Sequence, residues 1–147
     1  MESEELSETE IKCLLQKAIE VRNKAYSLTG IQVGAALLGR DGTIYTGCNI
    51  ENDVTNLGIC AERVAVFKAV SRGEQEFKAI AVVSNQDIVF PPCGACRQVL
   101  WQFVKEKHKD LLVIIGDKHG SYDPRNIKKL NELLPLAFSL KSETTNQ

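Results

Sequence analysis

Three thiols and a carboxylate in two short segments have the strongest potential for chemistry in this sequence. Residues 92–97 place Cys93 and Cys96 three positions apart, a spacing that lets both sulfur atoms reach one metal ion. Residues 60–63 add Cys60, with Glu62 two positions later. Three thiolates leave the fourth corner of a tetrahedral zinc ion open, which a catalytic site needs and a structural site avoids. We therefore predict one catalytic Zn²⁺ per chain, held by these three cysteines.

Glu62 and Arg63 are the residues that we expect to support this zinc chemistry. A zinc-bound water ionises near neutral pH, and a carboxylate just outside the ligand shell can move its protons. Glu62 can face the same pocket as Cys60 across the first turn of a helix without binding the metal. Arg63 can donate hydrogen bonds to a ligand sulfur and so draw off part of the negative charge of three thiolates. Both cysteine motifs stand where we expect helices to begin, and the free N–H groups there favour thiolate over thiol.

Two other roles for the cysteines stay open at this point. A Cys-x-x-Cys pair before a helix is also typical of a thioredoxin-like redox site, although that interpretation leaves Cys60 and Glu62 without a function. A structural zinc site in a binding or regulatory protein would need Cys13 or Cys48 as its fourth ligand. We expect both of these cysteines to be buried and inert, Cys13 in a helix and Cys48 at the end of a strand.

The composition of the 147 residues is that of an ordinary globular protein, with 44% hydrophobic and 25% charged residues. The net charge of −1 gives no basic surface for nucleic acid, so we expect a small-molecule substrate, and a polynucleotide-editing enzyme is disfavoured. Five cysteines, an odd number, indicate metal binding more than a disulfide framework. Residues 1–10 are too acidic and polar for a secretory signal, and no apolar run reaches the ~20 residues of a membrane span. We therefore expect a cytoplasmic protein that does not enter membranes.

Helical and strand-like periods alternate along the chain. A capping box, with Ser7 at the N-cap and Glu10 three positions later, begins the first helix. The expected elements are a helix to about residue 26, strands over 33–38 and 43–48 joined by a tight turn at 41–42, a loop over 49–58, a helix over 60–72, a strand over 79–83, a loop over 85–92, a helix from residue 93, a strand over 111–115 and a short helix over 126–134. This order predicts an α/β fold, a three-layer α/β/α sandwich with a mixed sheet of about five strands. We expect a single domain over residues 1–147, with mobile tails at 1–6 and 141–147.

Taken together, the motifs resemble those of the small, homotetrameric, zinc-dependent cytidine deaminases of the cytidine and deoxycytidylate deaminase superfamily. Residues 47–52, 57–63 and 92–99 follow three motifs of that family in order, and the similarity runs from about residue 33 to residue 135. The resemblance implies the cytidine deaminase-like fold and one Zn²⁺ per chain. It also implies hydrolytic deamination of cytidine and deoxycytidine in pyrimidine salvage, by a cytoplasmic homotetramer that takes free nucleosides.

The resemblance also implies roles for individual residues. Glu62 would protonate N3 of the base, take a proton from the zinc-bound water and pass one to the departing ammonia. Asn49 and Glu51 would hydrogen-bond the ribose hydroxyls, and the backbone N–H of Ala61 would hold the base carbonyl. Phe138 resembles an aromatic residue that these enzymes supply to the pocket of a neighbouring subunit.

Two departures from the family pattern lie on the substrate side of the site. Ile31 stands where the family has a phenylalanine that stacks on the cytosine ring, in a segment that is one residue shorter than usual, and the ring contributes about 1–3 kcal/mol per base. Asp53 and Thr55 stand where the family has a small residue and an aromatic residue. These changes raise an alternative hypothesis of a wider, more acidic base pocket. Its substrate would be a modified cytosine nucleoside, either N4-substituted or of the aminoacyl-nucleoside antibiotic type.

Overall fold

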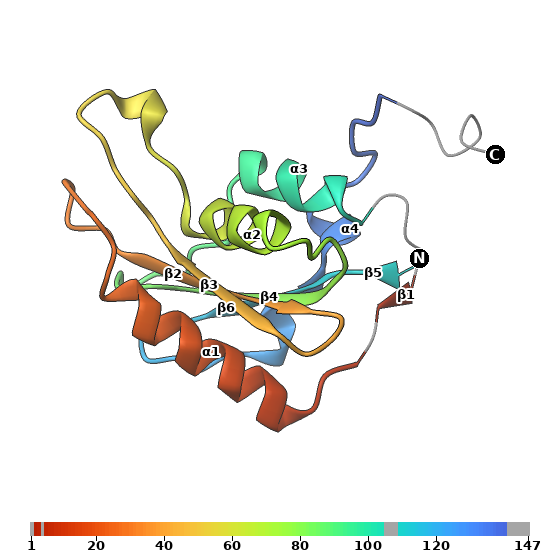
Figure 1. The fold of residues 1–147 in the computed structure, drawn as a ribbon. Helices are drawn as coiled ribbons and strands as arrows, with labels where there is room; N and C mark the ends of the chain where they lie inside the picture. Colours follow the sequence, from red (N-terminus) through yellow and green to blue (C-terminus); the bar gives the residue numbers. More distant parts are fainter. Residues whose placement is uncertain (1, 4, 105–108, 141–147) are drawn as a thin grey trace.

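The computed structural model describes residues 2–3, 5–104 and 109–140. Its centre is a five-stranded sheet with helices on both faces (Figure 1). The strands run in the order β3 (Ile44–Cys48), β2 (Val33–Gly39), β4 (Phe77–Ser84), β6 (Leu112–Gly116) and β7 (Ile127–Lys129). Helix α1 (Glu8–Arg22) covers one face of the sheet, and α2 (Ala61–Ser71) and α3 (Gly94–Gln102) cover the other. The predicted three-layer α/β/α sandwich with a mixed five-stranded sheet is confirmed.

Alternation along the strands builds a separate core on each face of the sheet. In β2 and β4, Leu37 and Ile80 pack with α2 and α3, whereas Ala36 and Ala81 pack with α1. Successive side chains of a strand point to opposite faces, so apolar runs such as residues 79–83 serve both layers at once. This explains why these strands are continuously hydrophobic instead of alternating with polar residues.

The directions of the strands decide where the functional segments meet. Strand β2 pairs antiparallel with both β3 and β4, so β3 and β4 run in the same direction on either side of it. Strand β4 is parallel to β6, and β6 is antiparallel to β7. The C-terminal ends of β3 and β4 therefore lie at the same end of the sheet, and from there the chain continues into α2 and α3. The N-termini of these two helices are thereby brought to one place.

Helix α1 begins as predicted and ends earlier than predicted. The Glu10 N–H donates to Ser7 Oγ over 3.1 Å, and the Ser7 N–H donates to Glu10 Oε1 over 2.9 Å, which completes the capping box. The helix stops at Arg22 and does not reach residue 26. The backbone of Tyr26 is taken up by a strand-like bridge, in which its N–H donates to Asn49 O and its carbonyl accepts from the Glu51 N–H. Tertiary pairing overrides helix propensity here.

The helix predicted over residues 126–134 is wrong in its first half. The segment contains a 3₁₀ turn, η2 (Pro124–Asn126), the strand β7, and only then a one-turn helix, α4 (Leu130–Leu133). Strand β7 pairs with β6, with Ile127 opposite Ile114, and this pairing satisfies backbone groups that β6 would otherwise expose at the edge of the sheet. The sequence pattern gave no sign of this edge pairing.

The first residues also have a partner in the structure. Strand β1 (Glu2–Ser3) forms a short parallel pair with β5 (Lys109–Asp110), and a further 3₁₀ turn, η1 (Thr55–Leu57), interrupts the predicted loop between β3 and α2. The mobility predicted for residues 1–6 stays a prediction, as does the single-domain organisation, and residues 141–147 lie outside the described part of the chain. No helix among the described residues has the length and apolarity needed to cross a membrane.

Candidate active site

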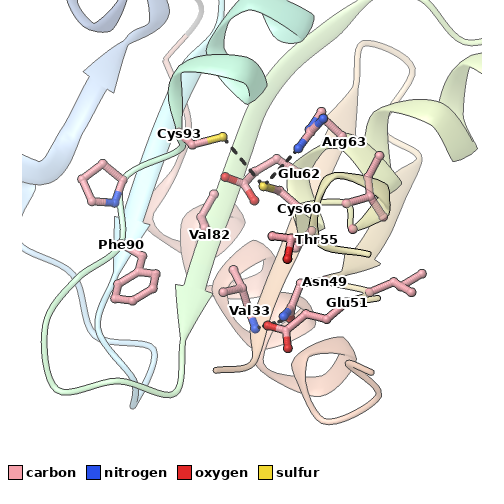
Figure 2. Close-up of a pocket in the computed structure, with 15 residues that line it drawn as sticks. Val33, Asn49, Glu51, Thr55, Cys60, Glu62, Arg63, Val82, Phe90 and Cys93 are labelled. Carbon is pink, nitrogen blue, oxygen red and sulfur yellow. Dashed lines mark hydrogen bonds between the residues drawn. The ribbon is translucent and has the colours of Figure 1, made fainter. Parts of the chain in front are cut away.

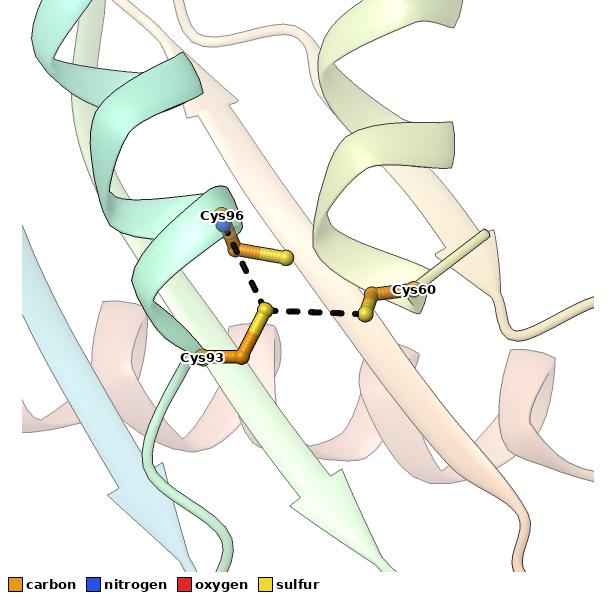
Figure 3. Close-up of side chains that lie close together, drawn as sticks. All are labelled: Cys60, Cys93 and Cys96. Carbon is orange, nitrogen blue, oxygen red and sulfur yellow. Dashed lines mark hydrogen bonds between the residues drawn. The ribbon is translucent and has the colours of Figure 1, made fainter. Parts of the chain in front are cut away.

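The predicted metal-binding cysteines come from the first turns of two neighbouring helices. Cys60 is the N-cap of α2, and Cys93 is the N-cap of α3, with Cys96 inside the first turn of α3. The sulfur of Cys93 accepts a hydrogen bond from the Cys96 N–H at 3.5 Å, so one ligand atom also caps its helix (Figure 3). The positive end of each helix dipole favours the thiolate form of these side chains.

The arrangement of the three sulfur atoms fits a zinc ion. All three lie within 4.8 Å of one another, and the sulfurs of Cys60 and Cys93 are 3.7 Å apart. Zinc–sulfur bonds of about 2.3 Å in tetrahedral geometry require sulfur atoms about 3.8 Å apart. Among the described residues, no histidine or carboxylate joins this group. The donor set is therefore three thiols, which leaves one position of a tetrahedral ion for water.

Cys13 and Cys48 lie outside this cluster, which removes the basis for a four-cysteine structural site. The prediction that both would be buried is wrong. Cys13 is exposed on α1, and Cys48, at the end of β3, is only partly buried. Helical spacing places residue 13 between two core positions, Ile11 and Leu14, but on the solvent side of the helix.

Arg63 and the neighbouring thiols control the charge of Cys60. Hydrogen bonding from the Cys96 thiol, with a further contribution from the Arg63 guanidinium, lowers the pKa of Cys60 to about 5. Arg63 Nη2 donates to the Cys60 sulfur at 3.4 Å. In the same pair the pKa of Cys96 is raised, because its thiol donates to Cys60 and is buried. Cys60 is therefore the member of this pair that ionises more readily, and the thiolate is the form of cysteine that binds metal ions.

Glu62 is a buried carboxylic acid beside the thiols, with only 4% of its surface exposed. Burial raises the pKa of Glu62 to about 7, and the negative charge of Cys60 acts in the same direction. A carboxyl group with this pKa can both accept and donate a proton near neutral pH. The predicted position of Glu62, in the pocket of Cys60 but outside the metal ligands, agrees with this geometry.

A cavity of about 380 Å³ opens over Glu62; we call it the Glu62 cavity. Figure 2 shows the Glu62 carboxylate and the sulfurs of Cys60 and Cys93 at one end of it and Asn49 and Glu51 at the other. Polar groups thus stand at both ends. Apolar side chains line much of the rest of the wall: Val33, Ile50, Ile59, Val82, Phe90 and Pro91.

Asn49 and Glu51 are held by residues 28–33, which lead into the first residue of β2. Asn49 Nδ2 donates to Ile31 O at 2.9 Å, and Asn49 Oδ1 accepts from the Val33 N–H at 2.7 Å. The Glu51 carboxylate accepts from the Leu28 N–H and from both the N–H and the hydroxyl of Thr29. The Leu28 N–H, followed by the groups of Thr29, holds the pKa of Glu51 below its usual value. Both residues are therefore oriented before any ligand binds.

Two sequence-predicted binding residues do not line this cavity. Ile31 contributes its backbone carbonyl to Asn49, and its side chain is not part of the cavity wall. Phe138 is 68% exposed, and its carbonyl accepts from Gln98 Nε2 at 3.0 Å. Since Phe138 was predicted to act in a neighbouring subunit, its role stays a prediction. Thr55 lines the cavity, whereas Asp53 is exposed and does not, so the predicted extra acid is absent from the wall.

Phe90 lines the cavity, and the sequence reasoning missed it. It lies in the loop between β4 and α3, three positions before Cys93. That loop has no periodicity, so its side chains could not be assigned to an interior or an exterior face. Its closeness to a predicted metal ligand was the one available indication.

Comparison with known proteins agrees with the geometry of the site. A family model described as the cytidine and deoxycytidylate deaminase zinc-binding region matches residues 8–109. A cytidine deaminase from Sporosarcina psychrophila is 43% identical over 131 residues, which cover 88% of this chain and 92% of the relative. The crystal structure of a cytidine deaminase from Burkholderia pseudomallei matches with a TM-score of 0.78 at 38% identity, and covers 90% of this chain and 100% of that one.

A blasticidin-S deaminase from Bacillus cereus is a more distant relative, 29% identical over 134 residues, with 86% of this chain and 90% of the relative covered. The matched family region includes all three thiols and Glu62. The identity to the cytidine deaminases extends well beyond these motifs, over most of both chains. The chain therefore belongs to the cytidine and deoxycytidylate deaminase family, and it carries the zinc-binding region of that family.

Proposed function

We propose that this chain is a zinc-dependent hydrolytic deaminase that converts cytidine and deoxycytidine to uridine and deoxyuridine with release of ammonia. The observation that carries the proposal is the buried Glu62 carboxyl beside three thiols that fit one zinc ion, with Glu62, Cys60 and Cys93 lining one cavity. Relatives named cytidine deaminases at 43% identity support the choice of substrate. We propose further that the reaction serves pyrimidine salvage in the cytoplasm.

In this mechanism Cys60, Cys93 and Cys96 would hold the zinc ion. Zinc, when bound, lowers the pKa of a coordinated water toward neutrality and so provides the nucleophile for C4 of the base. Glu62 takes the proton that this water loses and delivers it to N3 of the pyrimidine. Glu62 then takes a second proton from the hydroxyl that has been added to C4 and delivers it to the amino group. The C4–N bond breaks, ammonia leaves, and the C4 carbonyl of the uracil ring forms. The Glu62 pKa of about 7 suits both directions of transfer.

The remaining groups orient the nucleoside. Asn49 and Glu51, at the far end of the cavity, hold the ribose hydroxyls, and both are fixed by hydrogen bonds to residues 28–33. Ala61 is the first residue of α2, and the N–H groups of the first helical turn have no partner within the helix. Its N–H is thus suited to the carbonyl oxygen of the base. Arg63 keeps the Cys60 sulfur hydrogen-bonded and partly neutralised.

We propose that the enzyme works as a homotetramer, with Phe138 completing the pocket of a neighbour. Large apolar side chains are exposed next to residues that line the cavity: Val54 at 55% and Leu57 at 65% flank Thr55 and Gly58 in the sequence, and Tyr26 at 60% pairs through its backbone with Ile50. Exposed apolar surface of this kind is typical of a protein interface. Light scattering measures the molar mass in solution, and a monomer that is fully active would rule out the proposed homotetramer. Replacing Phe138 with Ala should then lower turnover in the tetramer without changing zinc content.

The deciding experiment is turnover of cytidine by the zinc-replete protein and by Glu62→Gln, followed by the loss of ultraviolet absorbance. General acid–base catalysis by a side chain contributes about 10²- to 10⁴-fold, so kcat should fall by roughly a thousandfold or more. Zinc content should stay at one ion per chain, because Glu62 is outside the ligand set. Full activity of Glu62→Gln would leave the zinc in a structural role and reject the proposal.

A further inference from the structure

We propose that Phe90 is the aromatic wall against which the pyrimidine ring packs, and that it supplies from the β4–α3 loop what position 31 lacks. The inference rests on the proposed function for the identity of the ligand. Among the described residues that line the Glu62 cavity, Phe90 is the one aromatic side chain. Ile31, at the position where the family pattern has its stacking residue, is not part of the wall.

The place of Phe90 in the cavity matches the place of a base. The reacting carbon of the pyrimidine must reach the thiols and Glu62, while the sugar must reach Asn49 and Glu51. The ring of the base then occupies the middle of the cavity. Figure 2 shows Phe90 on one side of this region and Val33 and Val82 across from it, with Val82 nearer the metal end. A flat ring held there would meet Phe90 on one side and valine side chains on the other.

The backbone around Phe90 is stiff, so the wall is present before the substrate binds. Phe90 is followed by Pro91 and Pro92, which fix their own φ angles and restrict the residue before them to extended conformations. Arg97 Nε donates to Pro92 O at 2.7 Å, which ties the end of this loop to α3. Arg97 Nη1 also donates to Leu133 O at 2.8 Å, so α4 supports the same arginine.

The chemistry of an aromatic wall suits a nucleobase better than an aliphatic wall would. Base–aromatic stacking contributes about 1–3 kcal/mol per base, which corresponds to roughly 5- to 150-fold in affinity. It also favours a flat pyrimidine, whatever its ring substituents. Phe90 therefore weakens the case for a widened pocket, because the aromatic surface is relocated and not lost.

The test compares Phe90→Leu, which keeps an apolar side chain without the ring, with Phe90→Tyr, which keeps the ring. We expect Phe90→Leu to raise KM for cytidine about tenfold with a smaller change in kcat, and to raise the inhibition constant of uridine in parallel. Phe90→Tyr should stay within about threefold of the wild type. Val89→Ala, the neighbouring residue outside the cavity wall, is the matched control and should change neither constant.

Three outcomes would overturn the inference. The first is a wild-type KM in Phe90→Leu. The second is loss of zinc from Phe90→Leu, Phe90→Tyr and Val89→Ala together, which would give the loop a structural role. The third is full recovery of the wild-type KM when Ile31→Phe is added to Phe90→Leu, which would return the stacking role to position 31. Glu62→Gln is measured alongside. If it retains turnover, the proposed function fails whatever the Phe90 variants do; if it loses turnover while Phe90→Leu is unchanged, only the present inference fails.

Discussion

The two ends of the Glu62 cavity are built by different kinds of structure. The metal end comes from the first turns of α2 and α3, whose positions are set by buried packing against the sheet. The substrate end comes from residues 27–33, 49–58 and 85–92, which are mostly loops held by side-chain hydrogen bonds. The family pattern is intact at the metal end, whereas at the substrate end Ile31, Asp53 and Thr55 depart from it. Catalytic groups must keep their positions closely for the reaction to proceed, whereas the side chains that contact the substrate can be supplied by a different loop.

The largest effect should follow from a change at the metal end. Cys96→Ser removes a buried ligand, and we expect zinc content to fall from one ion per chain toward zero, with loss of all measurable deamination. Cys13→Ser is the matched control, because Cys13 is exposed and outside the cluster. Metal analysis and turnover are measured on the same samples. If Cys96→Ser kept both zinc and activity, Cys96 would not be a required ligand, and the metal end would tolerate change as the substrate end does.

Arg63→Gln tests the electrostatic support of the metal end. The change removes the charged donor that contacts the Cys60 sulfur, and partners of metal ligands typically contribute about 10- to 100-fold in metal affinity or activity. We expect a loss of kcat in that range with KM for cytidine little changed. Arg72→Gln, an exposed arginine at the end of the same helix, serves as the control. A loss confined to KM would assign Arg63 to substrate binding instead.

Thr29→Val tests the substrate end. It removes the hydroxyl that donates to Glu51 Oε2 at 2.9 Å and leaves the backbone N–H in place. Because this bond is exposed, we expect only about a three- to tenfold rise in KM for cytidine, with kcat preserved. Thr43→Val, in the β2–β3 turn, is the control. A fall in kcat with unchanged KM would show that Glu51 acts in the chemical step.

The smallest effect is on stability against acid. The pKa of Glu51 is lowered in the folded protein, so its charged form stabilises the fold at pH values above the ordinary carboxyl pKa, 4.5. That contribution is lost as pH falls through the lowered value. The difference in Tm between the wild type and Glu51→Gln should therefore be largest near neutral pH and shrink as the pH falls below the ordinary carboxyl pKa, 4.5. A Tm difference that grows on acidification would contradict this sign.

The metal end and the layers of the fold could be predicted from the sequence, because both follow from local patterns. Ligand spacing, the capping box and apolar runs each depend on residues that are close in the chain. What could not be predicted depended on tertiary pairing: the early end of α1, where Tyr26 pairs with residues 49–51, and strand β7, which completes the edge of the sheet. Phe90 was missed for a different reason: it lies in a loop, and a loop has no period that assigns its side chains to the interior or the exterior.

The shared direction of β3 and β4 has a consequence for how the protein acquires its metal. Cys60 and Cys93 are 33 residues apart, and they meet only after β2 has paired with β4 on one side and β3 on the other. The unfolded chain therefore offers at most the local Cys93–Cys96 pair, and the complete set of ligands exists in the folded chain alone. A zinc ion that binds the folded form in preference to the unfolded form shifts the folding equilibrium by mass action. The supply of zinc then affects the amount of folded protein as well as its activity. A chelator should lower the Tm of the protein progressively as the concentration of free chelator rises.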